Sequence, residues 1–185
     1  MLSLSAPPAG EPLSLPDVKA ALRIETDADD ALIERIVTVA RAFIERRLDL
    51  AILRQSWALT LTSVPLAPVC LRPGKVAAIT GGTVRYGDAA PRALTDGEAR
   101  LIRSVPARVA LDLPATEASA PLTELTVTFE TGWADAGAMP PELAHALMLL
   151  VVHYYEERQL FAAGRYVPVP ATLQAHIEAF REVRL

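Results

Sequence analysis

Cysteine, lysine and aromatic residues are scarce in this chain of 185 residues. Cys70 is the single cysteine, so an internal disulfide framework is excluded and a reducing compartment is expected. Lys19 and Lys75 are the only lysines among 18 basic residues, and the formal net charge is −4. A general nucleic-acid-binding protein carries a basic field, so the composition disfavours that class of function.

No apolar run in the sequence is long enough to cross a membrane. The longest, residues 143–155, is interrupted only by His145 and His153 and falls short of the roughly 20 residues that a membrane span needs. The first residues, MLSLSAPPAGEP, have neither the basic start nor the apolar core of a signal peptide. We therefore expect a protein made in the cytoplasm, with no membrane partner.

Motifs that carry chemistry are also missing. Gly81-Gly82 precedes strand-like residues and not a helix, so no phosphate-binding loop is predicted. His145 and His153 lie about 12 Å apart along a helix, at 1.5 Å per residue, which is too far to share one metal ion. We expect each to be partly buried and bonded to a neighbour. An enzyme site assembled from His145, His153 and Glu156 is the alternative; the prediction is no catalytic residue, no metal and no cofactor.

Two helices are predicted near the start of the chain. Ser14 and Asp17 have the spacing of a capping box, and they open a short helix over residues 15–22. A second helix, residues 29–48, follows an acidic stretch and repeats its apolar residues at helical spacing. The aspartates of that stretch are expected to cap the helix, because the glycine and distal glutamate of a calcium loop are absent; they are Asp27, Asp29 and Asp30.

Residues 55–132 change to the alternating pattern and turn dipeptides of short antiparallel strands. Residues 76–79 and 83–86 read as two short strands on either side of Gly81-Gly82. The best strand is 122–131, in which Leu125, Val127 and Phe129 face inward. Cys70 is expected to be a buried strand thiol.

A helix over residues 141–159 stands out because it is apolar nearly all round, and such a helix must be covered on most sides. We expect it to be the central helix of a bundle that also faces an oligomer interface. The residues expected to serve the core or that interface are Leu143, Leu147, Leu150, Val151, Tyr154 and Tyr155. Residues 1–13 are expected to form a flexible arm, and residues 161–185 a hinge followed by a helix at 171–183. The predicted fold class is α+β: a helical bundle from the N- and C-terminal helices with a small antiparallel β-sheet insertion.

Four stretches, taken in order, resemble one known family: SLPDVKAALRIETDADDALIERIVTVARAFIERRL, QSWALTL, LTVTFETGWADAGAMPPELAHALMLLVVHYYEERQ and VPATLQAHIEAFREVRL. The family is that of phage head–tail connector (adaptor) proteins, which phage-like gene transfer agents also encode. The resemblance covers nearly the whole chain from residue 14, with residues 63–121 matching only in their texture of strands and turns.

The resemblance implies a structural, non-enzymatic protein of the virion or phage-like particle, at the head–tail junction. Family members form a ring of about twelve copies that joins the portal protein to a further tail component, a stopper or tail terminator. The ring continues the DNA channel, and residues 14–160 would be the connector core. A modestly acidic protein suits such a channel, because strong phosphate contacts would hold the duplex that must slide past without sequence-specific binding.

The C-terminal segment is predicted to dock on the portal, because a Gly/Pro hinge at residues 164–170 precedes an amphipathic helix that needs a groove. The expected docking residues are Leu173, Ile177, Phe180, Arg181, Val183, Arg184 and Leu185. The alternative is that this helix packs on its own bundle. The N-terminal arm and the β-insertion are candidate contacts with the next tail component or a neighbouring subunit. The alternative function is a small acidic regulatory or protein-binding module that uses the β-insertion for recognition.

Overall fold

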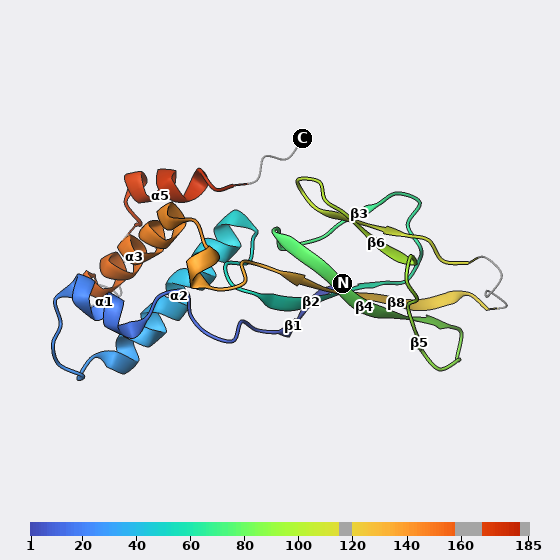
Figure 1. The fold of residues 1–185 in the computed structure, drawn as a ribbon, viewed down its shortest axis with the longest axis horizontal. Helices are drawn as coiled ribbons and strands as arrows, with labels where there is room; N and C mark the ends of the chain where they lie inside the picture. Colours follow the sequence, from blue (N-terminus) through green and yellow to red (C-terminus); the bar gives the residue numbers. More distant parts are fainter. Residues whose placement is uncertain (115–119, 158–167, 182–185) are drawn as a thin grey trace. The chain divides into compact units, whose positions relative to one another are not determined.

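The computed structural model describes residues 1–114, 120–157 and 168–181. The chain forms two compact units (Figure 1). The helical unit comprises Gly10–Leu53 and Trp133–Arg181, and the strand unit includes Met1–Ala9 and Arg54–Gly132. Helices and antiparallel sheets are both present, so the α+β class is confirmed.

The described helices are α1 (Leu15–Leu22), α2 (Asp30–Leu48), α3 (Pro141–Glu156) and α5 (Ala171–Glu178), with a 3-10 turn, η2 (Ala136–Ala138), before α3. The predicted start of α1 is confirmed, because the Ser14 side chain caps the helix by accepting the backbone N–H of Asp17. Asp29 occupies the cap position of α2 but makes no capping bond with its side chain. Its side chain accepts a hydrogen bond from the Tyr155 hydroxyl instead. The predicted placement of the aspartates is therefore confirmed, with Asp29 at the cap position and Asp30 in the first turn, but Asp29 does not cap through its side chain.

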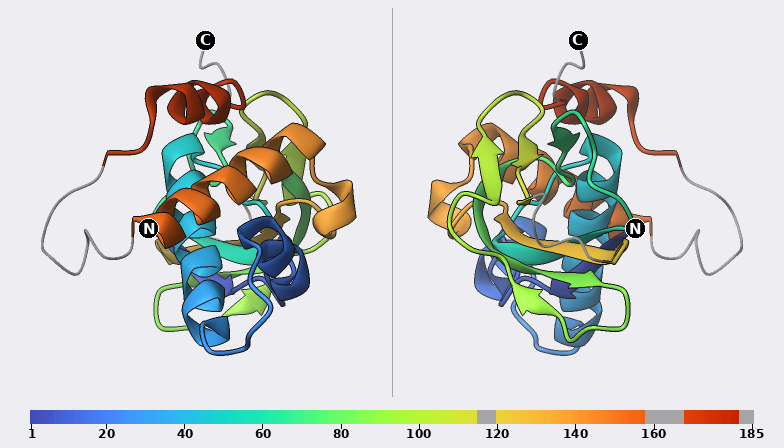
Figure 2. Two further views of the ribbon diagram at one scale, coloured as in Figure 1. Left: turned by 90° about the vertical axis from the view of Figure 1, so that its left-hand side faces the viewer. Right: turned by 90° about the vertical axis from the view of Figure 1, so that its right-hand side faces the viewer.

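One apolar core holds the helical unit together, with α5 beside α3 in two views (Figures 1 and 2). The amphipathic spacing of α2 places its apolar side inward, where Ile33 and Ile44 are fully buried. Phe43 on α2 meets Tyr154 on α3 edge to face, with ring centroids 6.5 Å apart. A parallel bridge joins Leu53 to Trp133, where the chain leaves the helical unit and returns to it.

The strand unit contains two antiparallel sheets. The five-stranded sheet has the order β1-β2-β8-β4-β5, and the three-stranded sheet has the order β3-β7-β6. The strands are β1 (Leu2–Ala6), β2 (Gln55–Leu61), β3 (Val69–Cys70), β4 (Val76–Tyr86), β5 (Arg92–Ala93), β6 (Ala99–Ile102), β7 (Arg108–Leu111) and β8 (Leu122–Thr131). The prediction of one small sheet is therefore wrong, because part of the insertion pairs separately as a second sheet.

The two sheets of the strand unit share one apolar layer. Val127 and Phe129 on β8 are fully buried against Val109 on β7 and Leu71 after β3. This confirms the inward face predicted for β8, where alternate residues point to the core and the others to the outer face. Thr126 lies on that outer face and faces Thr60 of β2 across the sheet.

β4 corrects the prediction of two short strands. It is one strand that runs through Gly81-Gly82, with register shifts against β8 where the chain bulges. A Cβ at Gly82 would lie 2.3 Å from the backbone oxygen of Thr126 and 2.6 Å from the Leu94 side chain. The glycine pair therefore allows close approach of neighbouring chain segments, whereas the sequence suggested that it ends a strand.

The ends of the chain also differ from expectation. Residues 2–6 form a strand, β1, paired with β2, so the N-terminal arm is not simply flexible. Pairing with β2 satisfies half of the backbone groups that an isolated arm would leave to water. The last helix, predicted over 171–183, ends at Glu178. Residues 158–167 and 182–185, which include most of the predicted hinge, lie outside the described residues.

Candidate assembly surfaces

The residues of α3 predicted for the core or for an oligomer contact pack in the core of their own chain. Leu143, Leu147, Leu150 and Val151 are each fully buried within the helical unit. Tyr154 and Tyr155 pack against the same core and are half-buried. Within one chain α3 is covered only in part, because Leu149 on its opposite side remains 39% exposed. A neighbouring subunit could therefore touch α3 only through that other side.

The residues predicted to dock on a portal differ in their burial. Leu173 and Ile177 on α5 are buried in the core of the helical unit, in contact with α2 and α3. Arg47 on α2 pairs with Glu178 at 2.6 Å and holds the end of α5. Phe180 packs partly against the same core, and Arg181 is exposed. Within the described chain, α5 thus adopts the alternative arrangement, in which it packs on the helices of its own chain. The remaining predicted docking residues, Val183, Arg184 and Leu185, lie outside the described residues.

The histidines and the cysteine form no common centre. His145 is exposed and His153 is half-buried, so the expectation of partial burial is wrong for His145. Cys70 is half-buried on β3, which contradicts the buried thiol expected there, because β3 is a short edge strand. Among the residues that the structure describes, no group of three His, Cys, Asp or Glu side chains is placed to hold a metal ion. None of the helices in the described ranges is long and apolar enough to cross a membrane.

A network of charges ties the segment before α1 to α2. Arg41 Nε donates to Glu11 at 2.7 Å, and Arg41 Nη1 donates to Glu45 at 2.9 Å. The second oxygen of Glu45 accepts the backbone N–H of Ile52 at 2.9 Å. Thr38 donates its hydroxyl to Glu11 at 3.0 Å. The sequence places Thr38, Arg41 and Glu45 on the polar side of α2. It gives no sign of their contact with Glu11, which lies far from Arg41 along the chain.

A buried carboxylate fixes the turn before β6. Glu98 is only 7% exposed, and both of its oxygens accept hydrogen bonds from the Arg92 guanidinium, at 2.7 and 2.9 Å. The backbone N–H of Thr95 donates to the same carboxylate at 2.7 Å. These bonds, that of Arg92 foremost, lower the pKa of Glu98 to about 2. The ion pair therefore exists throughout the pH range in which the folded protein would be handled.

A Glu98→Gln variant is expected to be less stable than wild type by about 2 kcal/mol near pH 6, because the charge-assisted pair is lost. The native pKa of Glu98 lies below its ordinary value of 4.5, so this stabilisation is fully present above that value and is lost as the pH falls towards about 2. Urea titrations at pH 6, 4 and 2.5 should show the difference between variant and wild type shrinking with acidity. Glu124→Gln is the control, since its pair with Arg85 is solvent-exposed and worth less than about 1 kcal/mol; a constant difference for Glu98→Gln would contradict the assignment.

β1 offers an exposed sheet edge. It is the outer strand of the five-stranded sheet, and all five of its residues are exposed, including Leu2 and Leu4. The N-terminal ammonium donates to the backbone oxygen of Thr60 at 2.6 Å and holds the start of the strand. An edge strand with exposed apolar side chains is a common place for contact with another chain.

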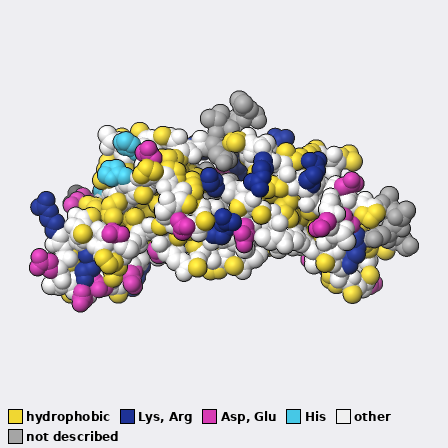
Figure 3. Space-filling view, in the orientation of Figure 1, with side chains coloured by type: hydrophobic (Ala, Val, Ile, Leu, Met, Phe, Trp, Pro, Cys, Tyr) yellow, Lys and Arg dark blue, Asp and Glu magenta, His cyan; other side chains and the backbone are white. Residues whose placement is uncertain are grey.

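Charge is unevenly divided between the two units. The helical unit contains 14 acidic and 9 basic residues, whereas the strand unit is nearly balanced, with 8 acidic and 9 basic residues. Figure 3 shows Lys and Arg side chains gathered on one face of the strand unit. The excess of acidic residues in the chain thus lies in the helical unit.

Comparisons with known proteins point to one kind of assembly. Residues 12–66, which hold α1, α2 and β2, match the family described as phage gp6-like head-tail connector protein. A chain in the neck of an empty GTA (gene transfer agent) particle, computed with C6 symmetry, has a TM-score of 0.79 and 24% identity. A chain in the virion of a native gene transfer agent particle has a TM-score of 0.79 and 25% identity. A chain in the neck of a native GTA particle, computed with C12 symmetry, has a TM-score of 0.68 and 26% identity.

Each of these three matches covers 100% of this chain and 97% of the other. The similarity therefore extends over both units and is not confined to the residues that match the family. A search of curated protein sequences finds no match.

Proposed function

We propose, from the premise that this chain is a head–tail connector protein, that it assembles as a ring of about twelve copies between the portal and the tail. Its role is structural, at the head–tail junction of a virion or gene transfer agent particle. The observation that carries the proposal is the similarity of the whole chain, in both units, to two chains in the neck and one in the virion of gene transfer agent particles. The helical unit would be the bundle that builds the body of the ring.

The charge of the chain fits a passage for DNA. A ring of copies with a net charge of −4 each gives the duplex no overall electrostatic attraction. Strong neutralisation of phosphates would hold the DNA in place, whereas DNA in a head–tail junction must move. We therefore include passing DNA, without sequence-specific binding, among the partners of the ring.

The C-terminal end remains the proposed contact with the portal. The burial of α5 determines which residues can be deleted to test this contact. Truncation after Pro170 would delete Leu173 and Ile177, and with them part of the core of the helical unit. Such a variant would lose stability as well as any docking contact. Removal of residues 182–185 alone leaves α5 and its buried residues in place.

The test is capture of the purified protein by the portal protein of the same gene cluster, followed by negative-stain imaging. Wild type should form a ring that caps the portal. The variant without residues 182–185 should be captured at least about tenfold less, a loss of about 1.4 kcal/mol in binding, with an unchanged melting temperature. Equal capture of the two would contradict C-terminal docking, and the absence of any ring with wild type, alone or on the portal, would contradict the connector function.

A further inference from the structure

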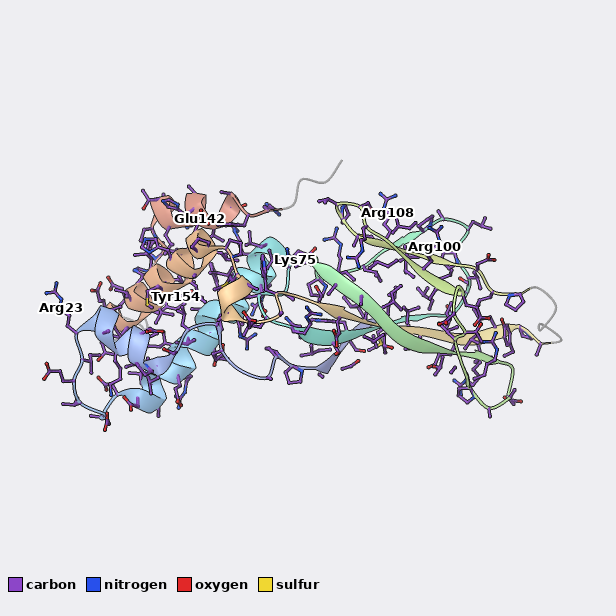
Figure 4. The ribbon with its side chains drawn as sticks, in the orientation of Figure 1. Arg23, Lys75, Arg100, Arg108, Glu142 and Tyr154 are labelled. Atoms are coloured by element: carbon purple, nitrogen blue, oxygen red, sulfur yellow. The ribbon has the colours of Figure 1, made fainter. Side chains whose placement is uncertain are left out.

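Two arginines share the outward face of the three-stranded sheet. Arg100 on β6 lies opposite Ala110 on β7, and Ile102 lies opposite Arg108. Side chains alternate along each strand, so Arg100 and Arg108 point to the same side as diagonal neighbours, about 7–8 Å apart. Val109 points the other way and is fully buried between the sheets, which leaves the arginines facing solvent (Figure 4).

A third arginine extends this face. Cys70 on β3 lies opposite Arg108, and Arg72 follows two residues later. Leu71 between them is buried in the apolar layer, whereas Cys70 and Arg72 are half-exposed, so the alternation continues beyond the end of β3. Arg72, Arg108 and Arg100 thus form what we call the basic face.

Arg100 and Arg108 form no ion pair with any described residue, unlike three other arginines of the strand unit. Arg54, Arg85 and Arg92 each pair with a glutamate, at 2.7 to 3.0 Å. Asp112 follows β7 on the side of Arg100 but makes no ion pair with it. Exposed arginines in this state keep all their donors for a partner with carboxylate or phosphate groups.

The helical unit carries a surface of the opposite sign. The bond between Asp29 and Tyr155 brings the end of α3 next to the turn between α1 and α2. Carboxylates gather there, and Lys19 pairs with two of them, Asp27 at 2.6 Å and Asp30 at 2.8 Å. We call this group the acidic end, and it consists of Glu25, Asp27, Asp29, Asp30, Glu156 and Glu157. Glu25 and Glu156 are exposed and form no ion pair with a described residue.

We propose that the basic face of one copy binds the acidic end of the next copy in the ring. A ring of identical subunits needs a heterologous interface, in which two different and complementary surfaces of the chain meet. The chain supplies such a pair, of opposite charge and on different units. The inference rests on the proposed ring, and it names the surfaces that would close it. Complementary charge of this kind fixes how two neighbouring subunits align and disfavours contacts between other surfaces.

A second copy suits the basic face better than nucleic acid does. Every copy of the chain carries both the basic face and the acidic end. Each basic face therefore has one complementary acidic end available on another subunit of the same ring. The chain as a whole is acidic and gives a duplex no overall electrostatic attraction. DNA binding by the basic face is therefore kept as an outcome of the test.

The test uses two full-length variants with reversed charges: a basic-face variant, Arg100→Glu with Arg108→Glu, and an acidic-end variant, Glu25→Arg with Glu156→Arg. Each alone should form at least about tenfold fewer rings than wild type by mass photometry and negative stain, because like charges then oppose each other at every interface. Mixed in equal amounts, they should form rings of alternating subunits, because one contact between them is the wild-type pair of surfaces and the other is the charge-swapped pair. A chain that carries all four changes should form rings by itself. Arg46→Glu and Glu142→Arg are controls, since both residues are exposed and belong to neither surface.

Ring formation by wild type and by both variants would overturn the inference and leave the connector function standing. Failure of wild type to form rings, alone or on the portal, would instead overturn the proposed function. Rings that persist in the basic-face variant, together with loss of binding to a fluorescent 30-base-pair duplex, would assign the basic face to DNA and overturn contact with a second copy. Restored rings in the fourfold variant, with normal rings in the controls, would establish the interface.

Discussion

A Leu147→Ala variant is expected to lose about 3–5 kcal/mol of stability, with a fall in melting temperature of about 10 °C. Leu147 is fully buried at the centre of α3, where its side chain packs in the core of the helical unit. Alanine would remove apolar contacts and leave a cavity that neighbouring helices fill only in part. Urea unfolding followed by far-UV circular dichroism measures the change.

The matched control is Leu149→Ala on the same helix. Leu149 is 39% exposed, so its truncation should change the free energy of unfolding by less than about 1 kcal/mol. The pair of variants compares two leucines of equal helix propensity that differ only in which side of α3 they occupy. Equal losses for both would mean that α3 is covered on all sides, as the sequence first suggests.

An Arg41→Ala variant is expected to lose about 2–4 kcal/mol, because it leaves two partly buried carboxylates without their common partner. Glu11 and Glu45 both accept hydrogen bonds from Arg41, whose side chain is only 12% exposed. Removing one member of a buried ion pair costs more than the pair itself contributes, since the charges left behind remain poorly solvated. The measurement is the midpoint of urea unfolding at pH 7.

Two further variants make that expectation specific. Arg46→Ala removes an exposed arginine from the same helix and should change stability by less than about 0.5 kcal/mol. Adding Glu45→Gln to Arg41→Ala should recover part of the loss, because the uncompensated charge is removed while the acceptor for the Ile52 N–H is kept. A loss no greater for Arg41→Ala than for Arg46→Ala would show that the network contributes little.

Predictions that rest on local chemistry agree with the structure. The Ser14 cap, the spacing of α2 and the alternation of β8 each depend on residues within one or two turns or within one strand. The same holds for the start of α3 at Pro141. Neighbours in sequence are enough to decide such features, and the resemblance to connector proteins rests on these same stretches.

Features decided by distant partners were missed. Gly82 is read locally as the end of a strand, but β8 and Leu94 pack against it and the strand continues. Residues 2–6 alternate leucine and serine over a stretch too short to predict a strand before Pro7-Pro8. β1 forms because β2 offers it an open edge. The basic face arises only when β3, β6 and β7 pair, so its arginines are scattered in the sequence.

The bridge between Leu53 and Trp133 has a consequence for synthesis of the chain. The strand unit is translated between α2 and α3, yet the core of the helical unit needs α3 to cover the apolar side of α2. At roughly 5–20 residues per second, the ribosome takes about 4–16 s to make residues 54–132. During this time the apolar residues of α1 and α2 are not covered by α3. The strand unit can therefore finish folding first, and the nascent helices are the part of the chain that a chaperone would meet.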